Sequence, residues 1–118
     1  PRTKLKIKEL GIELNVNIVE PVGYFDMMEL LKNCELVLTD SGGLQKEAYF
    51  FKKNCVTMRN ETEWVELTEN KVNIIVGSEK DKIVKGVQQM LAQKRDFSTN
   101  HYGIGNACEI IVKEISQK

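Results

Sequence analysis

The sequence predicts an α/β fold in which a parallel β-sheet carries helices on both faces. Three observations support this prediction. Short apolar runs rich in β-branched residues alternate with segments of helical periodicity along the 118 residues. These runs are apolar on both faces, as in a buried parallel sheet. Turns that contain glycine or proline separate the elements, and the length suits one domain with a single core.

The expected order is one helix, then four strand–helix pairs, then a last helix. The strands are expected at residues 15–19, 35–39, 54–58 and 72–76. The helices are expected at residues 3–10, 24–32, 44–51, 63–67, 78–93 and 107–115. The helices at 3–10, 24–32, 78–93 and 107–115 carry apolar residues at helical spacing, and the last one is expected to turn Ile110, Ile111 and Ile115 inward. Thr62 and Ser78 are expected to cap the helices that follow them.

The composition excludes several classes of function. Lys+Arg and Asp+Glu both total 17, so there is no electrostatic footprint for nucleic acid and no polybasic patch for a membrane. No apolar run approaches the roughly 20 residues of a membrane span. The spacing of Cys34, Cys55 and Cys108 predicts buried thiols in a reducing compartment rather than a zinc site or a disulfide frame. His101 lies in a different kind of segment, which argues against a cysteine–histidine catalytic pair.

A glycine turn between a strand and a helix is the sharpest functional signal. Residues 40–43 read Asp-Ser-Gly-Gly, and the first N–H groups of the following helix form a natural anion site. Ser41 is expected to cap that helix or to bind a phosphate oxygen. Glu47, one turn beyond the glycines, is placed to reach a sugar hydroxyl. The alternatives are a plain strand–helix turn and a surface carboxylate. Neither a P-loop nor a GxGxxG pattern is present.

Other candidate residues follow the third expected strand. The carboxyl ends of parallel strands meet at one edge of the sheet, where such folds bind ligands. Arg59 ends a strand there and is either an anion partner or a surface arginine. Trp64 is either a core residue or a pocket-lining one. Glu61, Glu63 and Glu66 could do acid–base chemistry or form an exposed acidic helix start.

Four segments together resemble a known family. TDSGGLQKEA, MRNETEWVEL and NHYGIGNA, with EPVGYFDMMELLKNC upstream, resemble successive segments of the non-hydrolysing UDP-N-acetylglucosamine 2-epimerases, in order and spacing. The resemblance implies a glycosyltransferase-B-type architecture, in which two Rossmann-like domains hold a UDP-sugar between them. It implies that residues 1–118 are a single UDP-binding Rossmann-like domain, the C-terminal part of a two-domain enzyme.

The resemblance also implies roles for individual residues. Ser41, Gly42 and Gly43 would hold the diphosphate, and Glu47 would bind the ribose hydroxyls. A loop at residues 21–27 would cradle the uracil. The complete set of implied UDP-binding residues is Val22, Met27, Ser41, Gly42, Gly43 and Glu47.

Two positions depart from the common bacterial form of the family. Trp64-Val65 stands where that form has an Arg-Pro pair whose arginine contacts the ligand, so this contact is lost or replaced. His101 stands where the family has proline in an Asn-Pro-Tyr-Gly run. The segments TEWVE and PVGYFDM are more similar to the branch that acts on UDP-2,3-diacetamido uronic acids.

The implied reaction interconverts UDP-GlcNAc and UDP-ManNAc, or a diacetamido-uronic acid analogue, for surface polysaccharide synthesis. UDP is eliminated and then added back on the other face of the sugar, with no metal or redox cofactor. The groups that move the proton belong to the missing domain, so no catalytic residue is expected here and the chain alone should bind UDP weakly without turnover. The implied full-length enzyme is a cytoplasmic homodimer. The alternatives are a glycosyltransferase of the same architecture and a nucleotide-sugar-sensing module.

Overall fold

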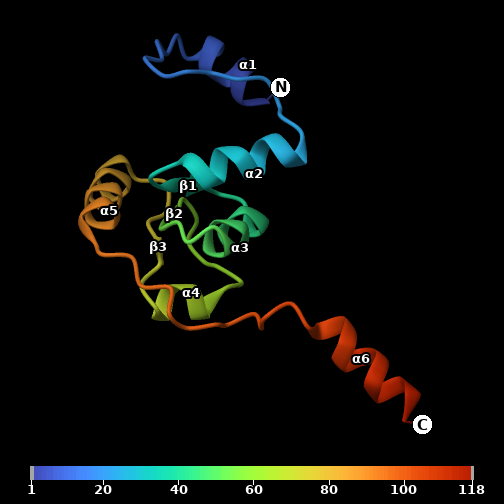
Figure 1. The fold of residues 1–118 in the computed structure, drawn as a ribbon. Coiled ribbons are helices and arrows are strands. Elements are labelled where there is room, and N and C mark those ends of the chain that lie inside the picture. Colours follow the sequence, from blue (N-terminus) through green and yellow to red (C-terminus); the bar gives the residue numbers. More distant parts are fainter. Residues whose placement is uncertain (1, 118) are drawn as a thin grey trace.

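The computed structural model describes residues 2–117, in which three strands are flanked by helices (Figure 1). The strands are β1 (Val37–Thr39), β2 (Cys55–Thr57) and β3 (Asn73–Ile75). The helices are α1 (Arg2–Glu9), α2 (Tyr24–Asn33), α3 (Gly42–Phe50), α4 (Val65–Glu69), α5 (Lys80–Ala92) and α6 (Ala107–Ser116). The predicted alternation of strands and helices is therefore confirmed from residue 24 onward.

The three strands form one parallel sheet in the order β1-β2-β3. Thr39 of β1 lies opposite Thr57 of β2, which in turn lies opposite Ile75 of β3. Because the strands are parallel and in register, their carboxyl ends reach the same edge of the sheet. The loops that follow the three strands therefore begin side by side, as the sequence predicts.

Each face of the sheet has its own apolar cluster. On one face Leu31 of α2 and Ala48 of α3 pack with Val37 and Cys55. On the other face Met90 of α5 packs with two residues of the β2 and β3 segments, Val56 and Val76. Burial raises the pKa of the Cys55 thiol to about 11. The three-layer arrangement, with helices on both sides of a parallel sheet, is confirmed.

The strand expected at residues 15–19 does not form. Val16 and Ile18 are exposed by 66% and 58%, and β1 is an edge strand of the sheet. The segment folds back toward α1 instead, where Lys4 pairs with Glu20 and Ile18 lines a groove with Ile7. A β-branched run becomes a strand only when a neighbouring strand supplies ladder hydrogen bonds, and this segment has none. The prediction of a fourth strand is therefore wrong for this chain.

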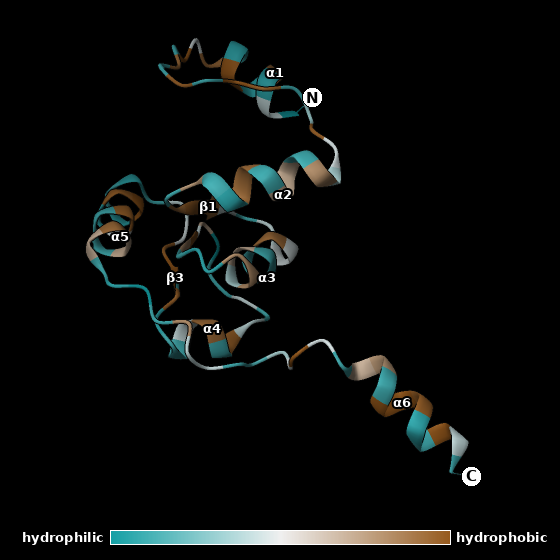
Figure 2. Cartoon of the chain, in the orientation of Figure 1, coloured by the Kyte–Doolittle hydropathy of each residue, from teal (hydrophilic) through white to brown (hydrophobic). Residues whose placement is uncertain are grey.

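The last helix forms where expected but does not face the core. Ile110, Ile111 and Ile115 are exposed by 52%, 55% and 69%, so their predicted inward orientation is wrong. Figures 1 and 2 show α6 standing away from the sheet with its apolar residues uncovered. This projection contributes to the elongated dimensions of 63 × 30 × 26 Å. Helical periodicity identifies an apolar face, but it does not say what covers that face.

Several element boundaries differ from the predicted ones. The helix after the glycine turn begins at Gly42, two residues earlier than expected. Helix α4 begins at Val65, and Thr62 accepts a hydrogen bond from the Trp64 backbone N–H at 3.1 Å rather than capping the helix. Helix α5 begins at Lys80 after a residue that makes no side-chain cap. Thr62 and Ser78 are therefore not the helix caps that the sequence predicts.

Two further expectations concern thiols and membranes. Cys55 is buried as expected, whereas Cys34 is partly buried and Cys108 is exposed, so the prediction of three buried thiols is wrong for two of them. All three are free thiols. Within residues 2–117, no helix has both the length and the apolar character needed to span a bilayer. The same residues contain no group of histidine, cysteine and acidic side chains that could hold a metal ion.

Candidate functional site

The glycine turn presents free backbone donors at the start of α3. Ser41 is the N-cap, and its Oγ accepts a hydrogen bond of 3.4 Å from the Leu44 N–H. The Ser41 N–H donates to Thr39 Oγ1 at 2.9 Å, which holds the turn against the end of β1. Within residues 2–117 the N–H groups of Gly42 and Gly43 have no acceptor. Two unpaired donors at the positive end of a helix dipole make an anion site.

The loop after β2 lies directly against this turn. A Cβ atom on Gly42 would meet Glu63 Oε2 at 3.0 Å and Arg59 Nη1 at 3.6 Å. The ends of the Glu63 and Arg59 side chains therefore lie close to the backbone of the turn. On its other side, the Arg59 carbonyl accepts a hydrogen bond of 2.9 Å from the Gly77 N–H. The loops that follow β1, β2 and β3 are therefore brought together at the carboxyl edge of the sheet.

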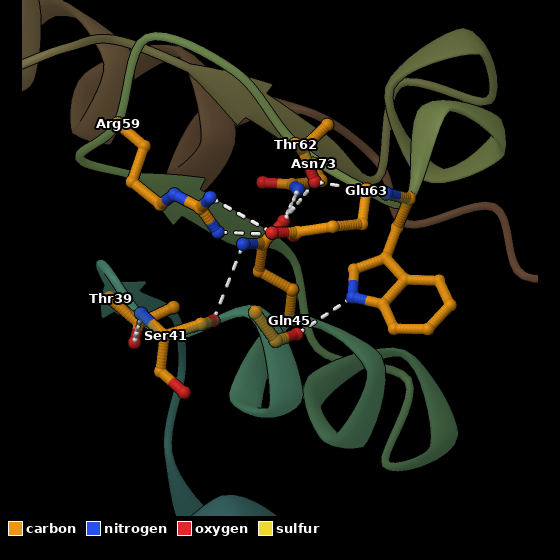
Figure 3. A network of polar contacts seen from close by, with 9 residues as sticks. Thr39, Ser41, Gln45, Arg59, Thr62, Glu63 and Asn73 are labelled. Carbon is orange, nitrogen blue, oxygen red and sulfur yellow. Dashed lines mark hydrogen bonds and ion pairs between the residues drawn. The ribbon is translucent and has the colours of Figure 1, made fainter.

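Arg59 supplies a positive charge at this edge, and the Glu63 carboxylate forms an ion pair with it. The guanidinium donates to both carboxylate oxygens of Glu63, at 3.0 and 2.9 Å (Figure 3). This bidentate hydrogen bonding lowers the pKa of Glu63. Arg59 also lines a polar cavity of about 540 Å³ with Asn60, Ser78 and Lys82. The arginine is thus positioned beside the glycine turn.

A buried amide connects the turn to the rest of the site. The fully buried Gln45 Oε1 accepts hydrogen bonds from Thr62 Oγ1 at 2.6 Å and from Asn73 Nδ2 at 2.9 Å (Figure 3). Its Nε2 donates to the Ser41 carbonyl at 3.3 Å. Asn73 Oδ1 accepts from Thr57 Oγ1 at 2.8 Å. One side chain therefore joins the turn, the loop after β2 and the strand β3.

Sequence reasoning missed this network entirely. The network involves one residue of a predicted helix, Gln45, and one residue of each of two predicted strands, Thr57 and Asn73. The signal was present, because polar residues at positions of a buried strand must find hydrogen-bond partners. Thr57 and Asn73 are both on strands predicted to be buried, and their partner could have been sought on the adjacent helix.

Trp64 contacts the backbone of the glycine turn. Its indole Nε1–H donates a hydrogen bond of 2.8 Å to the Gly42 carbonyl. Its ring packs edge-on against Tyr102, with the ring centres 6.0 Å apart. The Lys46 ammonium lies 4.6 Å from the centre of the indole and 4.4 Å from that of the Tyr102 ring. The structure thus places Trp64 beside the turn, partly buried.

The segment that contains His101 packs onto the same helices. The His101 backbone N–H donates to the Tyr49 hydroxyl at 3.3 Å, and the His101 ring nitrogen Nε2 lies 2.6 Å from Asn70 Nδ2. Burial raises the pKa of Tyr102, and the neighbouring Tyr102 hydroxyl lowers the pKa of Glu66. His101 therefore holds this segment against Tyr49 of α3 and Asn70 at the end of α4.

The remaining predicted site residues lie at different distances from the turn. Glu47 is partly buried on α3, one helical turn beyond the glycines, and makes no ion pair within residues 2–117. Val22 and Met27 line a groove of about 690 Å³ between α1 and α2. Met27 also lines a smaller groove with Leu44 of α3.

Comparison with known proteins identifies the family. Residues 1–116 match the model of the family described as UDP-N-acetylglucosamine 2-epimerase. The chain is 45% identical over 117 residues to the UDP-2,3-diacetamido-2,3-dideoxy-D-glucuronate 2-epimerase of Pseudomonas aeruginosa, covering 99% of this chain and 33% of that protein. It is 44% identical to a UDP-N-acetylglucosamine 2-epimerase of Methanocaldococcus jannaschii, with 96% of this chain and 32% of that protein covered.

Solved structures agree with this result. The fold matches that of the M. jannaschii UDP-GlcNAc 2-epimerase in complex with UDP-GlcNAc and UDP with a TM-score of 0.84 and 43% identity, over 100% of this chain and 34% of that one. The match confirms the predicted fold class. The chain spans about a third of the length of the curated relatives it matches. It belongs to the UDP-N-acetylglucosamine 2-epimerase family.

Proposed function

We propose that this chain is the UDP-binding domain of a 2-epimerase that acts on a UDP-linked 2-acetamido sugar. The observation that carries the proposal is the pair of unpaired N–H groups of Gly42 and Gly43 at the start of α3. They lie at the carboxyl edge of a parallel sheet, where α/β folds bind nucleotides. A related epimerase of the same fold forms a complex with UDP-GlcNAc and UDP, which supports the assignment of the anion.

The proposed binding residues divide by the part of UDP that they contact. Gly42 and Gly43 donate backbone N–H groups to the diphosphate, and the Ser41 hydroxyl binds a phosphate oxygen. The Glu47 carboxylate accepts hydrogen bonds from the ribose hydroxyls. Val22 and Met27, which line one groove between α1 and α2, contact the uracil. Arg59 and Trp64 support the loop that closes over the diphosphate.

The site chemistry suits elimination of UDP. When the C1–O bond breaks, its electron pair leaves with the diphosphate, and the proton leaves C2 to give a 2-acetamidoglucal. Donors fixed at a helix N-terminus stabilise the negative charge that develops on the leaving group. UDP then adds to the other face of the intermediate, and a proton returns to C2. The groups that move this proton lie in a second, N-terminal domain of the whole enzyme.

The names of the relatives support the proposed substrate. The proposed substrate is UDP-GlcNAc or a UDP-2,3-diacetamido uronic acid, because both sugars occur in the names of relatives with similar identity. The whole enzyme is proposed to work as a homodimer in the cytoplasm, where UDP-sugars for surface polysaccharides are made. Its interaction with the missing domain completes the active site.

Two measurements test the proposal. Calorimetric titration with UDP should give saturable binding that Ser41→Ala weakens by about ten- to a hundredfold, as expected for one hydrogen bond to a charged group. Ser116→Ala, which changes an exposed serine on α6, should leave the affinity unchanged. NMR of the full-length protein with UDP-GlcNAc should show inversion at C2. Absence of UDP binding, or transfer of the sugar to an acceptor without an epimer, would overturn the proposal.

A further inference from the structure

The indole of Trp64 is hydrogen-bonded to the peptide unit that joins Gly42 and Gly43 in the glycine turn. Its Nε1–H donates to the Gly42 carbonyl at 2.8 Å, and that carbonyl belongs to the same peptide unit as the Gly43 N–H. We propose that Trp64 is a positioning residue that aims the Gly43 N–H at the diphosphate. This inference rests on the proposed function, because it concerns how the same site holds the leaving group.

Peptide geometry connects the two ends of this unit. The peptide bond is planar and trans, so its C=O and N–H point in opposite directions. A hydrogen bond that fixes the Gly42 carbonyl therefore fixes the direction of the Gly43 N–H on the other side. Accepting a hydrogen bond at the oxygen also polarises the unit, which makes its N–H a better donor. Trp64 thus acts on the anion site without touching the ligand.

The indole adds a restraint to the one that the helix supplies, because Gly42 and Gly43 are the first two residues of α3 and Ser41 caps that helix. Glycine has no side chain and samples a wide range of backbone angles, and two glycines follow one another here. The space beside Gly43 is nearly empty, since a Cβ there would find only Ser41 Oγ, at 3.9 Å. Without the indole, this first peptide of the helix would fray more readily, and ordering it when the diphosphate binds would cost affinity.

The donor is itself held in place. The Trp64 backbone N–H donates to Thr62 Oγ1 at 3.1 Å, and Thr62 in turn donates to the buried Gln45. The indole ring is restrained by the edge-on contact with Tyr102 and by the Lys46 ammonium over its face. A side chain fixed at its backbone and along its ring delivers its single N–H with little freedom to move. This rigidity is what a positioning residue requires.

Ligands that differ in their phosphates separate positioning from general stability. Calorimetry on the intact protein should compare UDP with uridine, each titrated directly or by displacement. Replacing Trp64 by 3-benzothienylalanine preserves the shape of the ring but removes the N–H donor. This variant should bind UDP on the order of five- to tenfold more weakly, while its affinity for uridine stays unchanged. Trp64→Phe should show the same selective loss, and Val65→Ala, at an exposed neighbour, should show none.

The outcomes are distinct. Selective loss of UDP affinity in both Trp64 variants supports the inference. Equal weakening of UDP and uridine, or an unchanged UDP affinity in the benzothienyl variant, overturns it and leaves a purely structural role for the tryptophan. A wild-type protein that does not prefer UDP over uridine would instead overturn the proposed function, and the inference with it.

Discussion

The Gln45 side chain on α3 accepts a hydrogen bond of 2.9 Å from Asn73 on β3, although the two residues are 28 positions apart in the chain. Both side chains are buried, with at most 1% of their surface exposed. Gln45 also donates to the Ser41 carbonyl of the glycine turn. The pair therefore fixes the start of α3 relative to β3. A buried polar contact thus helps to set the geometry of the anion site.

Replacing Gln45 with leucine should destabilise the protein by about 2–4 kcal/mol. Leucine has a similar size, but it leaves Thr62 Oγ1, Asn73 Nδ2 and the Ser41 carbonyl without their partner, and each buried unpaired group costs about 1–3 kcal/mol. Urea denaturation monitored by circular dichroism measures the change. Gln89→Leu on the exposed side of α5 is the matched control and should change stability by less than about 0.5 kcal/mol. A Gln45→Leu protein as stable as wild type would show that water replaces the lost contacts.

Gly86 is the point of closest contact between α5 and the sheet. A Cβ atom at this position would approach Val76 Cγ1 to 2.8 Å and Ile74 Cδ1 to 3.0 Å. In an exposed helix, replacing glycine with alanine stabilises by about 1 kcal/mol. Here the added methyl group overfills a packed layer, which costs about 1–3 kcal/mol. The cost of overpacking should therefore outweigh the gain in helix propensity, so that Gly86→Ala lowers the stability of the protein.

Thermal unfolding of Gly86→Ala tests this reversal. We expect a melting temperature several degrees below that of the wild type, since about 1 kcal/mol corresponds to roughly 4–8 °C in a domain of this size. Lys85→Ala, one position earlier on the exposed surface of the same helix, should leave the melting temperature within about 2–4 °C of the wild-type value. A stabilised Gly86→Ala variant would mean that α5 shifts outward freely and that the contact with β3 is loose.

The fold could be predicted from the sequence wherever an element has its packing partner within the chain. Apolar runs such as residues 54–58 and 72–76 became strands because each found a parallel neighbour. The equally β-branched run at residues 15–19 did not, because no ladder forms between it and the edge strand β1. Local patterns record the preference of a segment, whereas strand formation also requires a neighbour, which the pattern does not specify.

The candidate site was predictable only in part, for a related reason. The glycine turn and Ser41 could be found because their spacing is local, within four residues. The Gln45–Asn73 contact and the bond from Trp64 to Gly42 span 28 and 22 residues. Such contacts depend on how loops from three strands meet, which the sequence fixes only through the whole fold. The sequence alone therefore does not decide whether Trp64 is a core residue or a pocket-lining one, whereas the structure shows that its indole contacts Gly42.

Neutralising Glu63 should strengthen the binding of UDP. The Glu63 carboxylate lies beside Gly42 and takes up both guanidinium donors of Arg59, so it places a negative charge next to the proposed diphosphate site. Glu63→Gln removes that charge and leaves Arg59 available to the phosphates. We expect about two- to fivefold tighter binding by calorimetry at low salt, with a smaller gain at high salt because exposed charges are screened. Glu61→Gln, in the same loop without this ion pair, should have a smaller effect.

The pH dependence supplies an independent check on the same pair. The hydrogen bonds from Arg59 lower the pKa of Glu63, so the ion pair persists above the ordinary carboxyl pKa and is lost as pH falls through the lowered value. The affinity gap between wild type and Glu63→Gln should therefore be constant near neutral pH and close in acid. Comparing the two proteins at each pH cancels the titration of UDP itself. A gap that closes above the ordinary carboxyl pKa would show that a different group controls Arg59.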